Sequence, residues 1–253
     1  MKYDNNYFDH IGSHFLKNIY ATAKGRIRLA VLQRDLQPLL IDQKLHILDI
    51  GGGAGQMALW YASLGHQVIV VDISNTLLDE GKRVAQKLGL PIKFICADIF
   101  RLDEVLADTR FDLVCCHAVL EWIEDAAALL NICAARMTSG GYLSLMFYNH
   151  SALLFAQHVF ANFDYINRRL RPYRKTAKLT PTYPCEPEFI AAQLDTLKLL
   201  RVQRSAIRCF YDYMKPHDRE RHTLDTLIAY ELTLSSSEKY INVARYIHEL
   251  RQK

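Results

Sequence analysis

A glycine-rich segment between two apolar runs constrains the fold of this chain more than any other feature. The first run, residues 46–50 (HILDI), leads into residues 51–55 (GGGAG), and a segment of helical composition follows. The second run, residues 68–71 (VIVV), ends at Asp72. Glycine permits a tight turn and lets a ligand approach bare backbone. The pattern therefore predicts two parallel strands with a nucleotide-type cofactor site at their carboxyl ends.

The spacing of the glycines favours one class of cofactor. Glycines stand at positions 51, 53 and 55, and Gln56 occupies the place where a dinucleotide fingerprint has its last glycine. With Asp49 two residues before Gly51, the segment resembles the first motif of class I S-adenosylmethionine-dependent methyltransferases. An NAD site and a tight turn without a ligand are the alternatives, although consecutive glycines lose much conformational entropy on folding. In either cofactor site, the Asp72 carboxylate is expected to accept hydrogen bonds from the ribose hydroxyls.

The length and composition predict one globular domain. The chain has 253 residues, of which 50% are hydrophobic and 23% charged. We divide it into an N-terminal helical cap (1–42), a cofactor-binding core (43–149), an insertion (150–185) and a C-terminal part of the sheet (186–253). It has no apolar run of about 18 residues, as a membrane span requires, and its polar N-terminus lacks the pattern of a signal peptide. We therefore expect a cytoplasmic protein without a membrane partner.

The cysteines and histidines do not suggest a metal site. Six cysteines show no C-x-x-C pair, and Cys115-Cys116 falls in an apolar run. Ten histidines are dispersed along the chain. We expect reduced cysteines that act as small apolar residues of the core, and no metal.

Apolar runs and helical segments alternate along the rest of the chain. Ser74 and Gly89 are suited to begin and end a helix. The predicted strands cover 92–96, 111–116 and 142–147, with a helix over 124–137 and two late strands near 199–209 and 240–247 that flank a helix near 218–232. This order predicts an α/β Rossmann-like fold with a mostly parallel seven-stranded sheet and helices on both faces. Ala97, Asp98, His117, Tyr148 and Asn149 then join the glycine loop at the carboxyl edge of the sheet.

A basic segment follows the fifth predicted strand, where this fold needs only a short connection. No acid occurs from residue 166 to 185. A solvated loop is one interpretation of the segment. Its place beside the catalytic edge, with Tyr165 and Tyr173 interleaved, favours a surface that binds RNA phosphates and stacks on bases. The six predicted nucleic-acid-binding residues are Arg168, Arg169, Arg171, Arg174, Lys175 and Lys178.

Stretches along almost the whole chain resemble the bacterial tRNA 5-carboxymethoxyuridine methyltransferases. They include residues 17–28, 117–122 (HAVLEW), 140–149, 162–165 (NFDY), 179–184, 210–213 (FYDY) and 244–248 (ARYIH). The resemblance implies transfer of a methyl group from S-adenosylmethionine to the carboxylate of 5-carboxymethoxyuridine at the tRNA wobble position, which forms 5-methoxycarbonylmethoxyuridine. It implies the tRNA anticodon stem-loop as partner and leaves monomer or homodimer open. Family members often carry an acid where this chain has Ala54.

The same resemblance assigns the cofactor residues. Arg28 is implied as the partner of the methionine carboxylate, for which a planar guanidinium is well suited. His117 is implied at the rim near the methionine, with a strand-end histidine bonded to backbone as the alternative. The full predicted set is Arg28, Asp49, Gly51, Gly52, Gly53, Asp72, Ala97, Asp98 and His117.

The implied chemistry needs no general base, because a carboxylate of ordinary pKa is ionised at neutral pH. Positioning should then dominate catalysis, and we predict that Lys24, Tyr148 and Arg245 orient the substrate. A helix over 16–32 would place Tyr20, Lys24 and Arg28 on one face. The structural alternatives are a solvated face for Lys24, packing and turn roles for Tyr148 and Asn149, and an outward position on an alternating strand for Arg245.

Two other functions compete with this one. A small-molecule methyltransferase, acting on a carboxylate or a quinone precursor, would share the cofactor motif and leave the basic segment without a role. A non-catalytic RNA-binding protein could retain the cofactor pocket as structure, although the intact set of Asp49, glycines and Asp72 argues against it.

Overall fold

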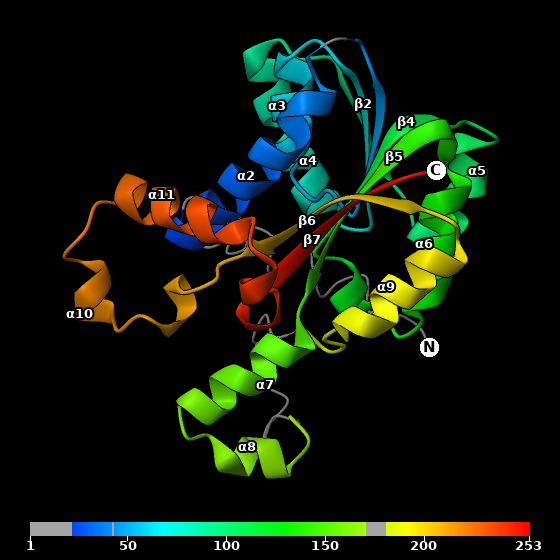
Figure 1. The fold of residues 1–253 in the computed structure, drawn as a ribbon. Helices are drawn as coiled ribbons and strands as arrows, with labels where there is room; N and C mark the ends of the chain where they lie inside the picture. The colour runs from blue at the N-terminus through cyan, green and yellow to red at the C-terminus, as the bar shows by residue number, and fades with distance from the viewer. Residues whose placement is uncertain (1–21, 42, 171–180) are drawn as a thin grey trace.

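A seven-stranded sheet forms the centre of the molecule, in the order β3-β2-β1-β4-β5-β7-β6 (Figure 1). The computed structural model describes residues 22–41, 43–170 and 181–253. Strands β1 to β5 pair in parallel, and β7 runs antiparallel between β5 and β6. The predicted mostly parallel sheet is confirmed. The strands are β1 His46–Ile50, β2 Gln67–Asp72, β3 Ile92–Cys96, β4 Phe111–His117, β5 Met137–Tyr148, β6 Leu200–Ile207 and β7 Tyr246–Gln252.

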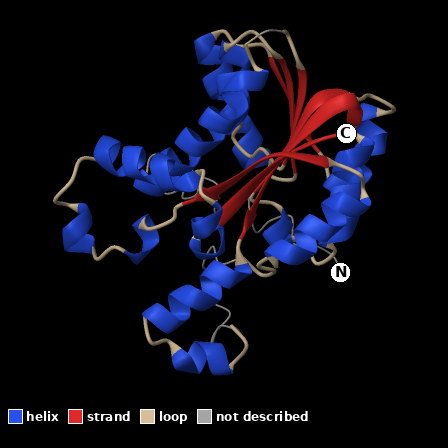
Figure 2. Ribbon diagram, in the orientation of Figure 1, coloured by secondary structure: helices blue, strands red, loops and turns tan. Residues whose placement is uncertain are grey.

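Helices cover both faces of the sheet, as Figure 2 shows by the red strands between blue helices. One face carries α2 (Ala23–Leu36), α3 (Gln56–Ser63) and α4 (Asn75–Leu88), with α11 (Leu224–Ser235) beside α2. The other carries α5 (Leu102–Leu106), α6 (Ala126–Ala135) and α9 (Pro187–Thr196). The short elements are α10 (Pro216–Arg219) and the 3-10 helices η1 (Gln37–Leu39), η2 (Ile99–Arg101), η3 (Leu120–Trp122), η4 (Tyr211–Tyr213) and η5 (Glu238–Val243).

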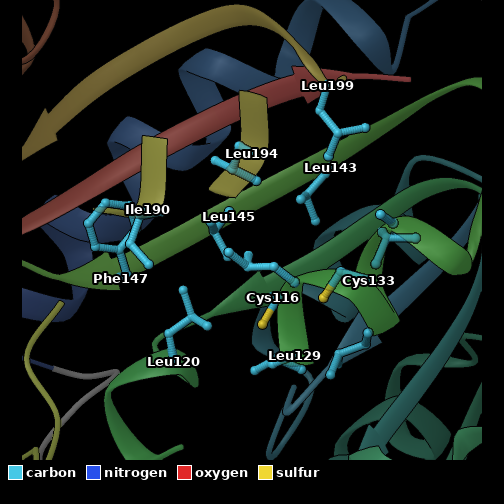
Figure 3. Packing of buried hydrophobic residues seen from close by; sticks show 14 of the residues in the cluster. Cys116, Leu120, Leu129, Cys133, Leu143, Leu145, Phe147, Ile190, Leu194 and Leu199 are labelled. Carbon is cyan, nitrogen blue, oxygen red and sulfur yellow. The ribbon is translucent and has the colours of Figure 1, made fainter. Parts of the chain in front are cut away.

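Strand β4 shows why the central strands are apolar throughout. Val114 and Cys116 pack toward α6 and α9, where Figure 3 shows Cys116 near Cys133 of α6. Leu113 and Cys115 pack on the opposite face, toward α2 and α3. A strand buried on both faces cannot alternate with polar residues. All six cysteines are free and five are buried, but Cys96 is exposed, so the predicted core role is wrong for that residue.

Helix α4 begins and ends where the sequence predicted. The Ser74 hydroxyl accepts a hydrogen bond from the Leu77 N–H at 3.3 Å. Gly89 ends the helix in the left-handed conformation, with φ +67°. Both are features that the residue types favour at helix ends.

Three predicted boundaries in the sequence differ from the structure. The last strand covers Tyr246–Gln252, because the run near 240 forms η5 with Ile241 buried; short apolar runs do not distinguish strand from helix. The predicted helix near 218–232 is two helices, since Thr223 caps a new one by accepting from the Thr226 N–H. Strand β5 begins at Met137 and includes Gly140 and Gly141.

An excursion separates β5 from α9. Helices α7 (His150–Val159) and α8 (Phe163–Asn167) leave the end of β5 and project away from the sheet (Figure 1). The chain returns to the same point, where the backbone of Cys185 forms an isolated parallel β-bridge with that of Asn149. Arg171, Arg174, Lys175 and Lys178 lie outside the described residues. In the described part of the chain, no helix has the length and apolar character needed to cross a membrane.

Candidate active site

The loop after β1 presents bare backbone in a confined space. Gly51 has a φ of +65° and lies against the Val119 side chain. A Cβ at Gly52 would lie 2.7 Å from the carboxyl carbon of Asp49. Side chains at positions 51 and 52 would therefore force this loop to move, and the glycines keep it tight.

Asp72 at the end of β2 holds this loop in place. Its Oδ2 accepts a hydrogen bond from the Gly53 N–H at 2.8 Å, and its Oδ1 accepts from the Ser74 N–H at 2.9 Å. A carboxylate has about four acceptor sites. The predicted contact of Asp72 with ribose hydroxyls stays a prediction.

The other predicted acids at this edge have distinct environments. Asp49 is 3% exposed beneath the loop, and burial together with the Asp72 charge raises its pKa to about 7. Asp98 caps η2 by accepting from the Phe100 N–H at 2.9 Å. The Ala97 N–H donates to the Asp72 carbonyl oxygen at 3.1 Å, which joins the ends of β2 and β3. The predicted cofactor residues of β1, β2 and β3 therefore share one edge.

His117, partly buried at the end of β4, begins a chain of polar contacts that leads into the interior. Its Nε2 lies 2.8 Å from Ser144 Oγ, which lies 2.9 Å from His248 Nε2. Burial, with the charges of His248 and Arg28, lowers the pKa of His117 well below its usual value. The alternative of a histidine bonded to backbone is wrong, since the partner is a serine side chain. Among the described residues, His117 Nδ1 has no hydrogen-bond partner.

Glu121 in η3 is a buried acid outside the predicted set of site residues. The side chain of Tyr246 donates a hydrogen bond to its carboxyl group, and Arg28 interacts with it electrostatically. Burial raises the pKa of Glu121 to about 7 in spite of these partners. Its position in an apolar segment directly after a strand was the available signal.

Three cations from separate elements surround the buried carboxylate of Asp212 in η4. Lys24 Nζ lies 2.8 Å from Oδ1, Arg208 Nε lies 2.9 Å from Oδ2, and Arg245 Nε lies 3.6 Å from Oδ2. Burial raises the pKa of Asp212, but the charges of Arg208, Lys24 and Arg245 bring it below the usual value. This cation cluster, Lys24, Arg208 and Arg245 around Asp212, carries two more positive than negative charges.

Tyr148 joins the cation cluster to the end of β5. Its hydroxyl accepts a hydrogen bond from Arg245 Nη1 at 2.8 Å, and its ring lies 5.3 Å from the Tyr246 ring. The structure thus brings together Lys24, Tyr148 and Arg245, the three predicted substrate-orienting residues. Asp212 and Arg208 were missed, although Asp212 lies in the quoted stretch 210–213 and Arg208 lies near the end of the predicted strand 199–209.

Asn149 has a structural role instead. Its amide donates to the carbonyl oxygens of Ile241 and Ala244, each at 3.0 Å, and its oxygen accepts from the Ser151 N–H at the start of α7. The alternative of a turn asparagine therefore holds for this residue.

Comparisons with known proteins identify the family to which this site belongs. The tRNA 5-carboxymethoxyuridine methyltransferase of Escherichia coli (strain K12) is 37% identical, over 97% of this chain and 95% of that protein. This chain belongs to the tRNA 5-carboxymethoxyuridine methyltransferase family. Residues 48–145 match a methyltransferase domain family. The predicted family and the predicted dependence on S-adenosylmethionine are confirmed.

More distant relatives share parts of this methyltransferase. A ubiquinone biosynthesis O-methyltransferase of Rhodopseudomonas palustris (strain HaA2) is 35% identical over 49% of this chain and 48% of that protein. The crystal structure of magnesium protoporphyrin IX methyltransferase from Synechocystis PCC 6803 with bound SAH aligns with a TM-score of 0.66 at 15% identity. It covers 98% of this chain and 97% of that chain, which confirms the predicted fold.

The residues at the edge of the sheet fit the cofactor of this methyltransferase family. Gly51 and Gly52 have no side chains that would cover the backbone of the loop. Buried polar atoms without a partner among the described residues, His117 Nδ1 and Gln56 Oε1, lie on elements that border the loop. A polar ligand would satisfy such groups, whose burial without a hydrogen bond is otherwise costly.

Proposed function

We propose that this protein transfers a methyl group from S-adenosylmethionine to the carboxylate of 5-carboxymethoxyuridine at the wobble position of tRNA, which forms 5-methoxycarbonylmethoxyuridine. The observation that carries the proposal is the 37% identity to the Escherichia coli enzyme over 97% of this chain. A likeness limited to the cofactor site would not extend through the cation cluster and the α7–α8 excursion.

The roles of the cofactor residues are part of this proposal. Arg28 pairs with the methionine carboxylate, and Asp72 and Asp98 bind the ribose and the adenine. Gly51, Gly52 and Gly53 provide the close backbone approach, and His117 borders the methionine. Asp49 lies under the loop and is 3% exposed, so it supports the glycines rather than facing the ligand.

The chemistry requires positioning more than proton transfer. When bound, S-adenosylmethionine supplies a methyl group whose bond to sulfur breaks, with the electron pair left on sulfur, as the carboxylate oxygen forms its bond to carbon. The acceptor carboxylate is ionised at neutral pH, so this chain does not have to remove a proton. Lys24, Tyr148 and Arg245 hold the acceptor in line, and positioning of this kind contributes about 7–11 kcal/mol in favourable cases.

The α7–α8 excursion is the proposed surface for the anticodon stem-loop. Phe155, Phe160 and Phe163 are 46%, 48% and 56% exposed there. Arg168 and Arg169 follow directly at the end of α8. Exposed aromatic rings beside cations suit unpaired bases and the phosphates that join them. Exposed apolar rings that lie together on a protein surface commonly mark a binding site.

Two observations distinguish this proposal from its competitors. The ubiquinone biosynthesis O-methyltransferase matches only 49% of this chain, so that likeness extends to the shared methyltransferase part and not to the whole site. Tyr148 and Arg245 are partly buried beside the cofactor edge, and a 2.8 Å hydrogen bond joins their side chains. An RNA-binding protein without catalytic activity would not need polar side chains positioned in this way.

Purified protein, radiolabelled S-adenosylmethionine and tRNA that carries 5-carboxymethoxyuridine provide the test. Label in the nucleoside digest should appear in 5-methoxycarbonylmethoxyuridine and should disappear when the ester is hydrolysed by alkali. Absence of label in the nucleosides would refute the enzymatic proposal.

The RNA surface is tested separately. Replacing Arg168, Arg169, Arg171 and Arg174 by Ala should weaken tRNA binding and reduce its salt dependence, while the affinity for S-adenosylmethionine stays the same. Unchanged methylation at several salt concentrations would contradict a role for this segment.

A further inference from the structure

We propose that Arg208 binds the carboxylate of the acceptor nucleoside and that Asp212 is a positioning residue that aims Arg208 at it. The inference rests on the proposed function and names the residue that selects a carboxylated uridine. Arg208 follows the last residue of β6, at the same edge of the sheet as Tyr148 and Tyr246.

Arg208 is ion-paired through the Nε edge of its guanidinium group. Its Nε lies 2.9 Å from Asp212 Oδ2, and its Cζ lies 5.2 Å from the centre of the Tyr246 ring. The side chain is only 14% exposed. Among the described residues, no hydrogen bond from its Nη1 or Nη2 is found. These two nitrogens form the planar fork that fits a carboxylate.

The other two cations of the cluster are less suited to this role. Arg245 already donates from Nη1 to the Tyr148 hydroxyl. Lys24 is 48% exposed and binds the far oxygen of Asp212. With three cations around one carboxylate, the cluster is short of negative charge, and a second carboxylate at Arg208 would reduce that imbalance.

The backbone conformation of Arg208 also sets this residue apart. Its φ of +62° lies in the left-handed region, which residues other than glycine seldom adopt. Such conformations persist where the surrounding structure fixes them, and they cluster at functional sites. With this backbone conformation, the guanidinium group of Arg208 lies over the ring of Tyr246, the first residue of β7.

Tyr246 links this carboxylate subsite to the proposed cofactor site. The charges of Arg208 and Arg28 both act on its hydroxyl, which also hydrogen-bonds to Glu121. Tyr246 is therefore influenced both by Arg208 and by Arg28, the residue proposed to hold the methionine carboxylate.

The chemistry gives this subsite a second consequence. Methylation converts the bound carboxylate to a neutral ester, as the oxygen–carbon bond forms, the carbon–sulfur bond breaks with its electrons left on sulfur, and no proton moves. The charge that Arg208 recognises is then gone. The product tRNA should bind more weakly than the substrate tRNA, which favours release.

The test compares tRNA that carries 5-carboxymethoxyuridine with the same tRNA carrying 5-methoxyuridine, which lacks the carboxylate. In Arg208→Gln, the KM for the carboxylated tRNA should rise roughly 10- to 100-fold. The binding preference of the wild-type protein for the carboxylated tRNA should disappear, and the affinity for S-adenosylmethionine should not change. Arg201→Gln, at the exposed far end of β6, is the matched control and should behave as wild type.

Asp212 is tested by the same preference. Asp212→Asn should raise the KM more than it lowers the kcat, and Asp212→Glu should restore part of the preference. A purely structural role would change the melting temperature of the protein without changing its preference between the two tRNAs. If Arg208→Gln does not fold, Arg208→Gly suits the left-handed backbone and gives the same measurement.

Each contrary result has its own meaning. An equal loss of affinity for both tRNAs would show that Arg208 binds a backbone phosphate, and unchanged affinities for both would show that it binds no anion; either overturns the inference. Failure of the wild-type protein to methylate the carboxylated tRNA would count against the proposed function. The binding preference decides the role of Arg208 in that case too.

Discussion

The Asp35 carboxylate and the His248 imidazole form a buried pair that joins α2 to β7. Asp35 Oδ2 lies 2.7 Å from His248 Nδ1, and Asp35 Oδ1 accepts hydrogen bonds from Arg34 at 3.0 and 2.6 Å. Burial raises the pKa of Asp35, but His248, Arg34 and Ser205 together bring it below the usual value. Because α2 also carries Lys24 and Arg28, this pair holds two site residues against the sheet.

Asp35→Asn should lower the free energy of unfolding by about 3 kcal/mol, because a buried carboxylate loses its charge while its partners stay buried. Urea denaturation measures the change. Asp225→Asn is the control, since Asp225 is 84% exposed in its pair with Arg26 and should lose less than about 1 kcal/mol. Equal losses in the two variants would contradict the importance of the buried pair.

Asp49 should make the stability of the cofactor-free protein depend on pH. Its pKa is raised from 3.8 to about 7, so the folded state binds this proton more tightly than the unfolded chain does. The resulting stability is fully present below about pH 4 and is lost as pH rises to about 7. From pH 5 to pH 8, the free energy of unfolding of the wild-type protein should fall by roughly 2–3 kcal/mol more than that of Asp49→Asn. Parallel pH profiles of the two proteins would refute the raised pKa.

Gly52→Ala should abolish binding of S-adenosylmethionine, as measured by calorimetry. The added Cβ would lie 2.7 Å from the Asp49 carboxyl carbon and 2.9 Å from Val70 Cγ1. Gly89→Ala is the control, because no atom lies within 4 Å of an added Cβ there. That variant should lose about 1 kcal/mol of stability and keep its cofactor affinity. Normal cofactor binding by Gly52→Ala would show that the loop can adapt.

Tyr148→Phe should reduce kcat/KM for the carboxylated tRNA about tenfold, because Arg245 loses the acceptor that holds its guanidinium. Tyr142→Phe removes a hydroxyl from the middle of β5, six residues before Tyr148, where it accepts from Gln252 at 3.1 Å. Methyl transfer by that control should match wild type. A similar loss in both variants would indicate damage to β5 rather than to the site.

Phe163→Ala should weaken binding of the anticodon stem-loop, by about 5- to 50-fold if one base stacks on the ring. The ring is 56% exposed at the start of α8. Phe189→Ala on α9 removes a ring that is 48% exposed and should leave the affinity unchanged. Fluorescence anisotropy with labelled RNA distinguishes the two. Equal affinities of both variants and wild type would exclude Phe163 from the RNA surface.

The glycine loop, the parallel strands and the class of cofactor could be predicted from the sequence. Each depends on a local constraint: glycines that permit Gly51 to adopt a φ of +65°, apolar runs long enough for buried strands, and the Ser74 and Gly89 helix ends. The edge location of Asp72 and His117 followed from the rule that parallel strands place their carboxyl ends together.

Only the tertiary structure decided which distant residues meet. Strand β7 enters the sheet between β5 and β6, so Arg245 comes beside both Tyr148 and Arg208. The apolar pattern does not encode that strand order, and it also misplaced β7 itself, because η5 and β7 have similar composition. Asp212 pairs with Arg208 four residues earlier in the chain, but Lys24 and Arg245 come to it from distant parts of the sequence.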